Sequence, residues 1–216
     1  MYYIGTIKRD INFKGKVFTE YVTTFPFIDS KNNVRAIQAK RFDDNNHTGS
    51  TDFVHAIIER NLSKARKPTP KWIDEYKKNE IKVSCLFGEH LLLKYPLNPI
   101  ALVEAPKTAI YGALYFGFPK NDNDLLWLAV YNLSSLGLKR CRILQDRDVY
   151  LFPDLSMNGR AFKLWKDKAQ IIERELPGSR FVISDLLEKN ASDVDRLNGL
   201  DLADFLIKQD WRKFRK

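Results

Sequence analysis

The spacing of hydrophobic residues changes about midway along the chain. Before residue 45, hydrophobic and polar residues alternate, most clearly from Val34 to Phe42, which is typical of strands with one buried face. Several such strands in succession predict a small antiparallel sheet. After Pro99 the pattern consists of short, uniformly hydrophobic runs separated by segments with helical spacing. That order predicts parallel strands joined by helices.

The segment between these two regions contains a polar loop and two short amphipathic helices. We expect the loop over residues 43–50 and the first helix over residues 51–62, with Phe53 on its buried face. A basic loop follows, and Pro70 is expected to begin the second helix, because proline is well tolerated in the first turn.

The second half of the chain alternates strands with helices. Strands are expected over residues 100–104, 125–131, 148–154 and 180–185, and helices over residues 106–116, 159–176 and 200–205. A segment with two prolines, residues 94–99, is the best candidate for a linker. The sequence therefore predicts an N-terminal α+β subdomain over residues 1–95. A doubly wound α/β domain with a mainly parallel sheet is expected over residues 96–216.

Acidic residues follow two of the expected parallel strands. Glu104 ends one strand and Asp154 ends another. Because the carboxyl ends of parallel strands lie along one edge of a sheet, the two carboxylates are expected to face the same edge. Asp201 and Asp204 follow the last expected strand, and two or three carboxylates together suit Mg²⁺. The alternative is local, since acidic residues also stabilise helix N-termini and turns without any further function.

The overall charge favours a polyanionic partner. The chain of 216 residues carries 36 Lys and Arg against 27 Asp and Glu, which gives a net charge of +9. Nucleic acid is the first polyanion that such a charge suggests. An ordinary solubilising surface charge is the alternative, and composition alone does not separate the two.

Other function classes are disfavoured by what the sequence lacks. Cys85 and Cys141 are too far apart for a zinc ribbon or a disulfide framework. No hydrophobic run approaches the roughly 18 residues of a membrane span, and the N-terminus does not have the pattern of a signal peptide. We therefore expect a cytoplasmic protein without a membrane partner. Neither common glycine-rich phosphate-binding motif occurs.

Three short motifs in a fixed order resemble the Toprim domain, the topoisomerase–primase module. They are VEAPKTA from Val103, LFPDLS from Leu151 and GLDLADFL from Gly199. Upstream, the stretches TTFPFIDSKNNVRAIQAKRF and CLFGEHLL resemble the N-terminal part of the bacterial and phage primase catalytic core. The chain is also similar to Toprim-like proteins of Bacteroides mobile elements. The resemblance covers most of the chain and implies a primase-like role in DNA replication.

The resemblance implies roles for individual residues. Glu104 matches the family's glutamate, a general acid/base or metal ligand, and Lys107 beside it is a second catalytic candidate. Asp154 matches the first aspartate of a D-x-D pair that binds Mg²⁺, but Ser156 stands in place of the second, which weakens the site. Asp201 is the candidate replacement. The implied cofactor is Mg²⁺ or Mn²⁺, held by Glu104, Asp154 and Asp201.

Basic residues near the expected edge are candidate nucleic-acid contacts, because Lys and Arg neutralise phosphates. The candidates are Lys107, Lys139, Arg140, Arg160 and Lys163. The basic C-terminal tail around Trp211 and Phe214 is a further candidate, although these two aromatic residues also suit packing on the core.

Two hypotheses follow. The first is a Toprim-like protein with a weakened metal site that binds single-stranded or duplex nucleic acid within a replication or mobile-element primase system, together with a replication or helicase partner. The second is an active Mg²⁺- or Mn²⁺-dependent primase-like nucleotidyl transferase. An α/β protein that binds a small molecule is a third alternative.

Overall fold

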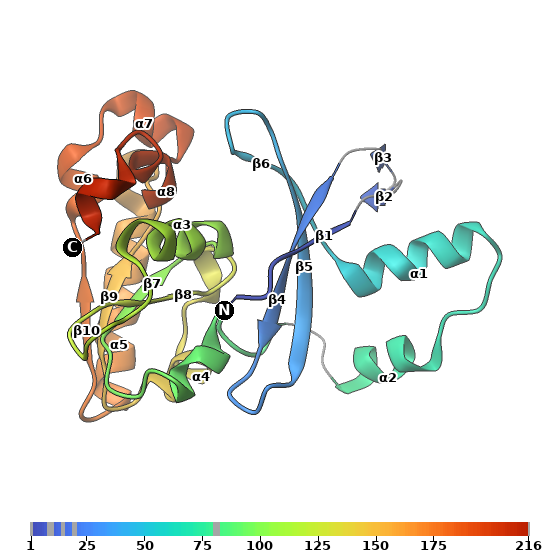
Figure 1. The fold of residues 1–216 in the computed structure, drawn as a ribbon, viewed down its shortest axis with the longest axis horizontal. Helices are drawn as coiled ribbons and strands as arrows, with labels where there is room; N and C mark the ends of the chain where they lie inside the picture. Colours follow the sequence, from blue (N-terminus) through green and yellow to red (C-terminus); the bar gives the residue numbers. More distant parts are fainter. Residues whose placement is uncertain (1, 8–10, 14–15, 19–20, 80–82, 216) are drawn as a thin grey trace. The chain divides into compact units, whose positions relative to one another are not determined.

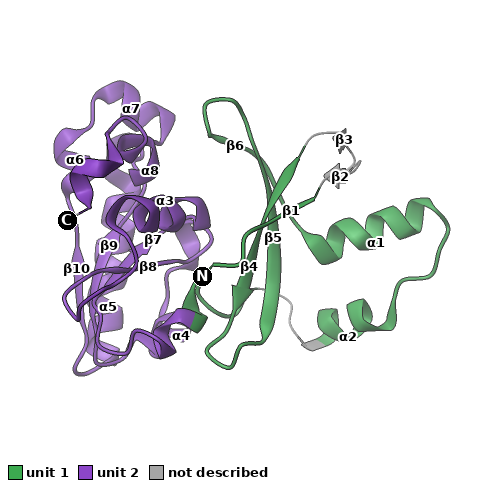
Figure 2. Ribbon diagram, viewed as in Figure 1, with its two compact units in different colours: residues 1–90 green, residues 91–216 purple. Residues whose placement is uncertain are grey.

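The structure, a computed structural model, describes residues 2–7, 11–13, 16–18, 21–79 and 83–215. The chain divides into two compact units, residues 1–90 and 91–216 (Figure 2). The linker expected from the sequence, residues 94–99, falls at the beginning of the second unit. No helix within the described ranges is both long and apolar enough to cross a membrane.

The first unit is built on an antiparallel sheet. Its four strands lie in the order β1-β4-β5-β6, and β2 and β3 form a separate two-stranded hairpin (Figure 1). The elements are β1 (Gly5–Ile7), β2 (Ile11–Phe13), β3 (Lys16–Phe18), β4 (Val22–Ile28), β5 (Val34–Phe42), β6 (Thr48–Phe53), α1 (Val54–Lys64) and α2 (Lys71–Asn79). The antiparallel N-terminal sheet expected from the alternating pattern is therefore confirmed.

One local expectation in this unit is wrong. Residues 48–53 form strand β6, which pairs with β5, rather than the end of a loop and the first turn of a helix. Phe53 ends this strand, and α1 begins only at Val54. The strand forms because β5 offers unpaired backbone groups along one side, and a tertiary ladder overrides the weak local preference of a Ser/Thr/Asp segment.

Both helices of the first unit are fixed by buried side chains. Ile57 of α1 packs with Val22 and Ala39 of the sheet in one hydrophobic cluster. Ile73 of α2 is completely buried. The Tyr76 hydroxyl of α2 also donates a hydrogen bond to the backbone carbonyl of Arg35, which ties α2 to β5.

The second unit is built on a parallel sheet with the strand order β10-β9-β7-β8. Its helices and strands are β7 (Ile100–Val103), α3 (Pro106–Phe116), β8 (Leu126–Ala129), α4 (Leu138–Cys141), β9 (Asp148–Phe152), α5 (Arg160–Glu175), β10 (Arg180–Ile183), α6 (Leu186–Asn190), α7 (Asp193–Asn198) and α8 (Leu202–Leu206). All four expected strands are present, each a little shorter than expected. The α/β fold class, with a parallel sheet after an antiparallel N-terminal sheet, is confirmed.

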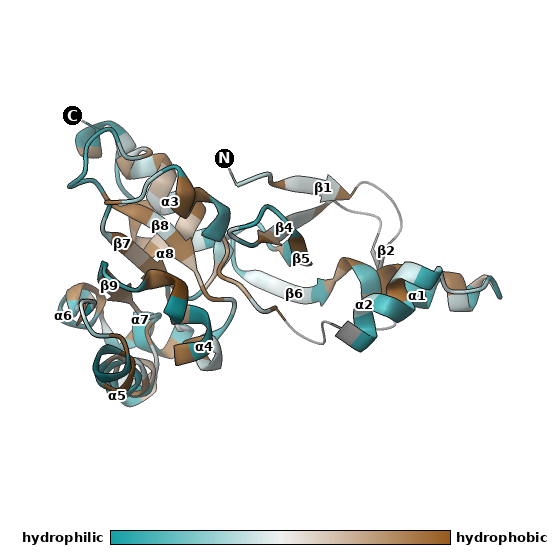
Figure 3. Ribbon diagram, turned by 90° about the horizontal axis from the view of Figure 1, so that it is seen from below, coloured by the Kyte–Doolittle hydropathy of each residue, from teal (hydrophilic) through white to brown (hydrophobic). Residues whose placement is uncertain are grey.

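The strand order reverses direction beside β7. From β7 the chain passes through α3 to β8 on one side, and it then returns to β9 on the other side of β7 before continuing through α5 to β10. Right-handed crossovers in opposite directions place α3 and α5 on opposite faces of the sheet, as Figure 3 shows. The gap between β7 and β9 at their carboxyl ends is therefore the topological switch point, where ligands bind in sheets of this kind.

The core of this unit is formed by strands that are buried on both faces. Every residue of β7 and β8 is buried, as expected for parallel strands covered by helices. Pro106 is the first residue of α3, where its missing N–H removes no hydrogen bond. The side chain of Trp127 packs directly against Gly112 of α3, so closely that a Cβ atom there would overlap the indole ring.

Candidate functional site

Glu104 and Asp154 flank the switch point. Glu104 directly follows β7, and Asp154 comes two residues after β9. These strands are parallel neighbours in which Val103 is paired with Phe152, so both acidic residues follow the same edge of the sheet. Each residue is partly buried. The parallel arrangement from which the sequence argument started is thus present, and the strands that carry the two acids are adjacent.

The segment before α8 returns to the same edge. The backbone N–H of Leu155, next to Asp154, donates a 2.9 Å hydrogen bond to the carbonyl of Leu200, next to Asp201. Asp201 is the N-cap of α8, and its carboxylate accepts a hydrogen bond from the N–H of Asp204. Asp204 accepts in turn from the N–H of Asp201, which completes a capping box.

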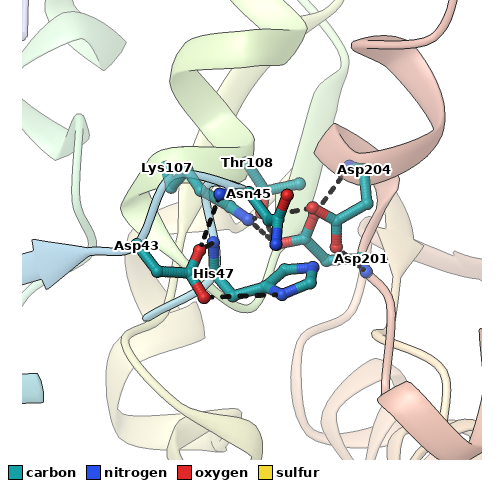
Figure 4. A network of polar contacts seen from close by, with 7 residues as sticks. All are labelled: Asp43, Asn45, His47, Lys107, Thr108, Asp201 and Asp204. Carbon is teal, nitrogen blue, oxygen red and sulfur yellow. Dashed lines mark hydrogen bonds and ion pairs between the residues drawn. The ribbon is translucent and has the colours of Figure 1, made fainter. Parts of the chain in front are cut away.

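A buried polar cluster joins α3 to α8 at this edge (Figure 4). The Lys107 ammonium lies 3.0 Å from an Asp201 carboxylate oxygen and 3.3 Å from one of Asp204. The Thr108 hydroxyl donates a 2.9 Å hydrogen bond to Asp201. All four side chains are buried. Burial would by itself lower the pKa of Lys107, but the two carboxylates outweigh it, and the pKa lies above its usual value.

This cluster decides what Lys107 contacts. Its ammonium is directed at two carboxylates within the protein, and its charge is balanced there. The roles expected for Lys107 in catalysis and in phosphate binding therefore stay predictions that this geometry does not favour. Thr108 was not among the expected site residues, and Asp204 was expected only as one of the carboxylates near the edge, not as a partner of Lys107. The spacing Asp201-x-x-Asp204 before a hydrophobic run was the available signal, because it is typical of a capping box.

The expected metal ligands fit a divalent cation poorly. Glu104 and Asp154 lie at the switch point, but the Asp201 carboxylate is occupied by Lys107, Thr108 and the N-terminus of α8. The Ser156 hydroxyl, at the second position of the D-x-D pattern, accepts a 2.7 Å hydrogen bond from the N–H of Ala161. Within the described part of the chain, no group of three or more His, Cys, Asp or Glu side chains is arranged to hold a metal ion.

The loop after β8 is held by two cations, one from α5 and one from α4. Lys168 of α5 donates hydrogen bonds to the carbonyls of Ser134 and Leu136, at 2.8 and 2.9 Å. Arg140 of α4 donates to the carbonyl of Ser135 and lies over the Tyr131 ring. Burial, followed by the Arg140 charge, lowers the pKa of Lys168. Because carbonyl oxygens are neutral, these contacts fix both cations in place without cancelling their charge.

The remaining basic candidates lie on exposed surfaces. Lys139 is an exposed residue of α4. Arg160 is the first residue of α5, close to the point where the chain leaves β9, and Lys163 follows one turn later. Both are exposed, while Trp165 of the same helix is buried against the core. Arg160 is therefore placed to reach the edge at which Glu104 and Asp154 lie.

The C-terminal tail packs on α3. The Phe214 ring contacts the rings of Tyr115 and Phe116, and Arg215 donates to the carbonyl of Leu114. Trp211 remains 48% exposed, and the Arg215 guanidinium lies over its ring.

Neither cysteine is suited to nucleophilic chemistry. Cys85 and Cys141 are both buried free thiols. Burial raises the pKa of Cys85 to about 12 and that of Cys141 to about 11. The thiolate, which is the reactive form, is therefore strongly disfavoured in both.

Sequence comparison places the chain in a family. Residues 1–155 match the family model described as "Domain of unknown function (DUF6371)". The chain belongs to the DUF6371 family. The matched region includes Glu104 and Asp154, whereas Asp201 and α5 lie beyond it. None of the curated proteins matches the chain by sequence.

Solved structures similar to this DUF6371 chain include three primase domains. The primase fragment of the bacteriophage T7 primase-helicase protein is 17% identical, with a TM-score of 0.46, and the match covers 89% of this chain and 63% of that one. The RNA polymerase domain of Mycobacterium tuberculosis primase DnaG is 19% identical, with a TM-score of 0.48, and the match covers 89% of this chain and 53% of that one. A DNA primase domain from Pseudomonas aeruginosa is 14% identical, with a TM-score of 0.40, and the match covers 91% of this chain and 54% of that one. The DUF6371 chain thus spans between about half and three-fifths of the length of these domains.

Proposed function

We propose that this protein binds nucleic acid at the carboxyl edge of its parallel sheet, with an acidic metal site that is weakened. The observation that carries the proposal is the switch point between β7 and β9, close to which α5 begins with the exposed Arg160. Lys139 and Arg140 belong to the β8–β9 crossover, and Arg160 begins the β9–β10 crossover. A switch point is where a sheet of this type binds ligands, and cations there favour phosphate.

The weakened metal site follows from the contacts of individual residues. Asp201 neutralises Lys107, and Ser156 caps a backbone N–H, so neither is left to complete a set with Glu104 and Asp154. We further propose, from the Toprim resemblance, that the protein acts in a replication or mobile-element primase system with a replication or helicase partner.

A second candidate function is an Mg²⁺- or Mn²⁺-dependent primase-like nucleotidyl transferase. It is favoured by one observation, the position of Glu104 and Asp154 on adjacent strands at the switch point. Glu104 is the residue of this chain that would accept or donate a proton there.

The binding proposal is tested by fluorescence anisotropy with a labelled single-stranded DNA oligonucleotide between 50 and 200 mM salt. We compare Lys139→Gln/Arg160→Gln with the control Lys94→Gln/Arg174→Gln. Arg174 lies on the same helix as Arg160 but in its last turn, about 21 Å away at 1.5 Å per residue.

For the wild type we expect binding to weaken steeply as salt rises. The slope of the logarithm of the binding constant against the logarithm of salt concentration (the salt slope) should be smaller in magnitude by about 1.4 for Lys139→Gln/Arg160→Gln, the edge variant, because each lost phosphate contact removes about 0.7. The control should keep the wild-type slope. Absence of binding at 50 mM salt, or equal losses in both variants, would overturn the proposal. Incorporation of nucleotides on a single-stranded template with Mn²⁺, lost in Glu104→Gln, would favour the transferase instead.

A further inference from the structure

The connection between α1 and α2 in the first unit carries a concentrated positive charge. Residues 64–71 include four Lys or Arg residues and no Asp or Glu, in a chain whose net charge is +9. The four are Lys64, Arg66, Lys67 and Lys71, and all are exposed. We call this segment, together with Trp72, the α1–α2 tip.

The backbone of the tip is held in a defined conformation by hydrogen bonds. The N–H groups of Ala65, Arg66 and Lys67 donate hydrogen bonds back to the carbonyls of α1's last turn. Arg66 holds a left-handed conformation, with φ of 53°, which reverses the chain at the helix end. Beyond the turn, α2 is fastened by the buried side chain of Ile73. The cations are thus presented from a defined turn.

Few acidic groups balance the charge of the tip. Lys71 lies 3.5 Å from Glu75 in an exposed ion pair, which is worth little in water. For Lys64, Arg66 and Lys67, no ion pair or side-chain hydrogen bond with another residue occurs within the described ranges. A phosphate approaching the tip would therefore not compete with an internal carboxylate at these three positions.

Trp72 adds an aromatic surface beside the cations. Its side chain is 51% exposed, while the adjacent Ile73 is completely buried. Two of the other tryptophans, Trp127 and Trp165, are buried in the second unit. About half of the indole thus stays in water, and the stabilisation that its full burial would provide is forgone. An exposed aromatic ring in a segment that carries several cations is a feature on which unpaired bases stack.

We propose that the α1–α2 tip binds an unpaired nucleic-acid strand, with its cations on the phosphates and Trp72 stacked on a base. The proposal deepens the proposed function by adding a second contact surface, but it rests on different residues from the carboxyl edge. A duplex offers phosphates without an accessible base face, so the single strand is the partner that uses both features.

The test measures binding of the full-length protein to oligo(dT) and to a duplex of equal length. Trp72→Ala should weaken oligo(dT) binding about tenfold, since stacking contributes about 1–3 kcal/mol per base, and should leave duplex binding within about twofold. Leu97→Ala, which truncates an exposed apolar side chain of the second unit, should change neither. Quenching of tryptophan fluorescence by oligo(dT) should be reduced in Trp72→Phe.

Charge is tested separately. The triple variant Lys64→Gln/Lys67→Gln/Lys71→Gln should lower the salt slope for oligo(dT) by about 2, while the matched control Lys94→Gln/Lys120→Gln/Lys189→Gln should not. Arg66 is left in place because of its backbone conformation. Unchanged thermal unfolding of each variant establishes that it is folded.

The outcomes separate the two proposals. If the edge variant Lys139→Gln/Arg160→Gln loses binding and the tip variants keep it, the tip proposal is overturned and the proposed function stands. If the tip variants lose binding and the edge variant keeps it, the tip proposal stands and binding at the carboxyl edge is overturned. Equal loss of strand and duplex binding in Trp72→Ala would also overturn the stacking role.

Discussion

The ammonium of Lys107 lies 3.0 Å from the carboxylate of Asp201, in a buried contact that joins the first helix of the parallel-sheet unit to the last. Asp204 lies on the other side of the same ammonium, at 3.3 Å. This contact occupies a carboxylate that the Toprim resemblance suggested as a metal ligand. The contact therefore holds α8 against α3, as a clamp would, and a metal centre that includes Asp201 is less favourable.

The clamp makes a prediction about stability. Lys107→Met should lower the free energy of unfolding by about 3 kcal/mol, because it leaves two buried carboxylates without their cation. Urea denaturation at pH 7 measures the change, and hydrogen exchange should show early loss of protection over residues 202–206. Lys120→Met, at an exposed lysine, should stay within about 0.5 kcal/mol. An equally small effect of Lys107→Met would show that the cluster does not clamp α8.

Glu104 separates the two candidate functions. In a protein that only binds nucleic acid, Glu104→Gln removes a negative charge near the phosphates and should tighten binding to single-stranded DNA. The expected gain in affinity is at most about fivefold. This corresponds to the interaction energy of roughly 1 kcal/mol between two unit charges about 4 Å apart in water. In a transferase, the same change should abolish turnover. Anisotropy and nucleotide incorporation on the same preparations give both readouts.

Glu89 predicts a pH dependence in the first unit. Its carboxylate accepts hydrogen bonds from the N–H groups of Ser30 and Leu86, at 3.1 and 2.9 Å. Burial, which is the largest influence, outweighs these bonds and raises the pKa of Glu89 above its usual value. The folded chain therefore binds a proton at Glu89 more readily than the unfolded chain does, and lower pH should favour the folded state through this residue.

The measurement is the free energy of unfolding at pH 5, 6 and 7 for the wild type and for Glu89→Gln. The wild type should gain stability relative to the variant as the pH falls toward the ordinary glutamate pKa. The gain should be lost as the pH rises through the raised value. A difference between the two proteins that stays constant across this range would contradict the assignment.

Gly112 tests the packing of α3 on the sheet. Alanine is the better helix former by about 1 kcal/mol, so Gly112→Ala would stabilise an exposed helix. Here the added methyl group would overlap the buried Trp127 ring, and overpacking typically costs about 1–3 kcal/mol. We expect a net loss of stability and a changed near-ultraviolet circular dichroism signal from Trp127. Gly137→Ala, where no atom outside the two neighbouring residues lies within 4 Å of the added carbon, should be nearly neutral.

The boundary between β6 and α1 shows where local patterns stop being informative. A polar segment rich in Ser, Thr and Asp resembles a loop with a helix cap, and the sequence predicted one. The same residues form a strand because β5 provides backbone partners for them. Helix α3 is the opposite case, because proline at its first position and helical spacing up to Phe116 are both local signals, and its predicted bounds are the observed ones.

The sequence by itself determined the fold class, the four strands of the second unit and the positions of Glu104 and Asp154 just after strand ends, because each depends on a few consecutive residues. Only the tertiary structure decided that β9 lies beside β7, which makes their carboxyl ends a switch point. It also decided that Lys107 is neutralised by Asp201 and Asp204, and that Trp72 stays exposed beside the basic turn. These features depend on contacts between segments far apart in the chain, and periodicity within one segment carries no information about its distant partners.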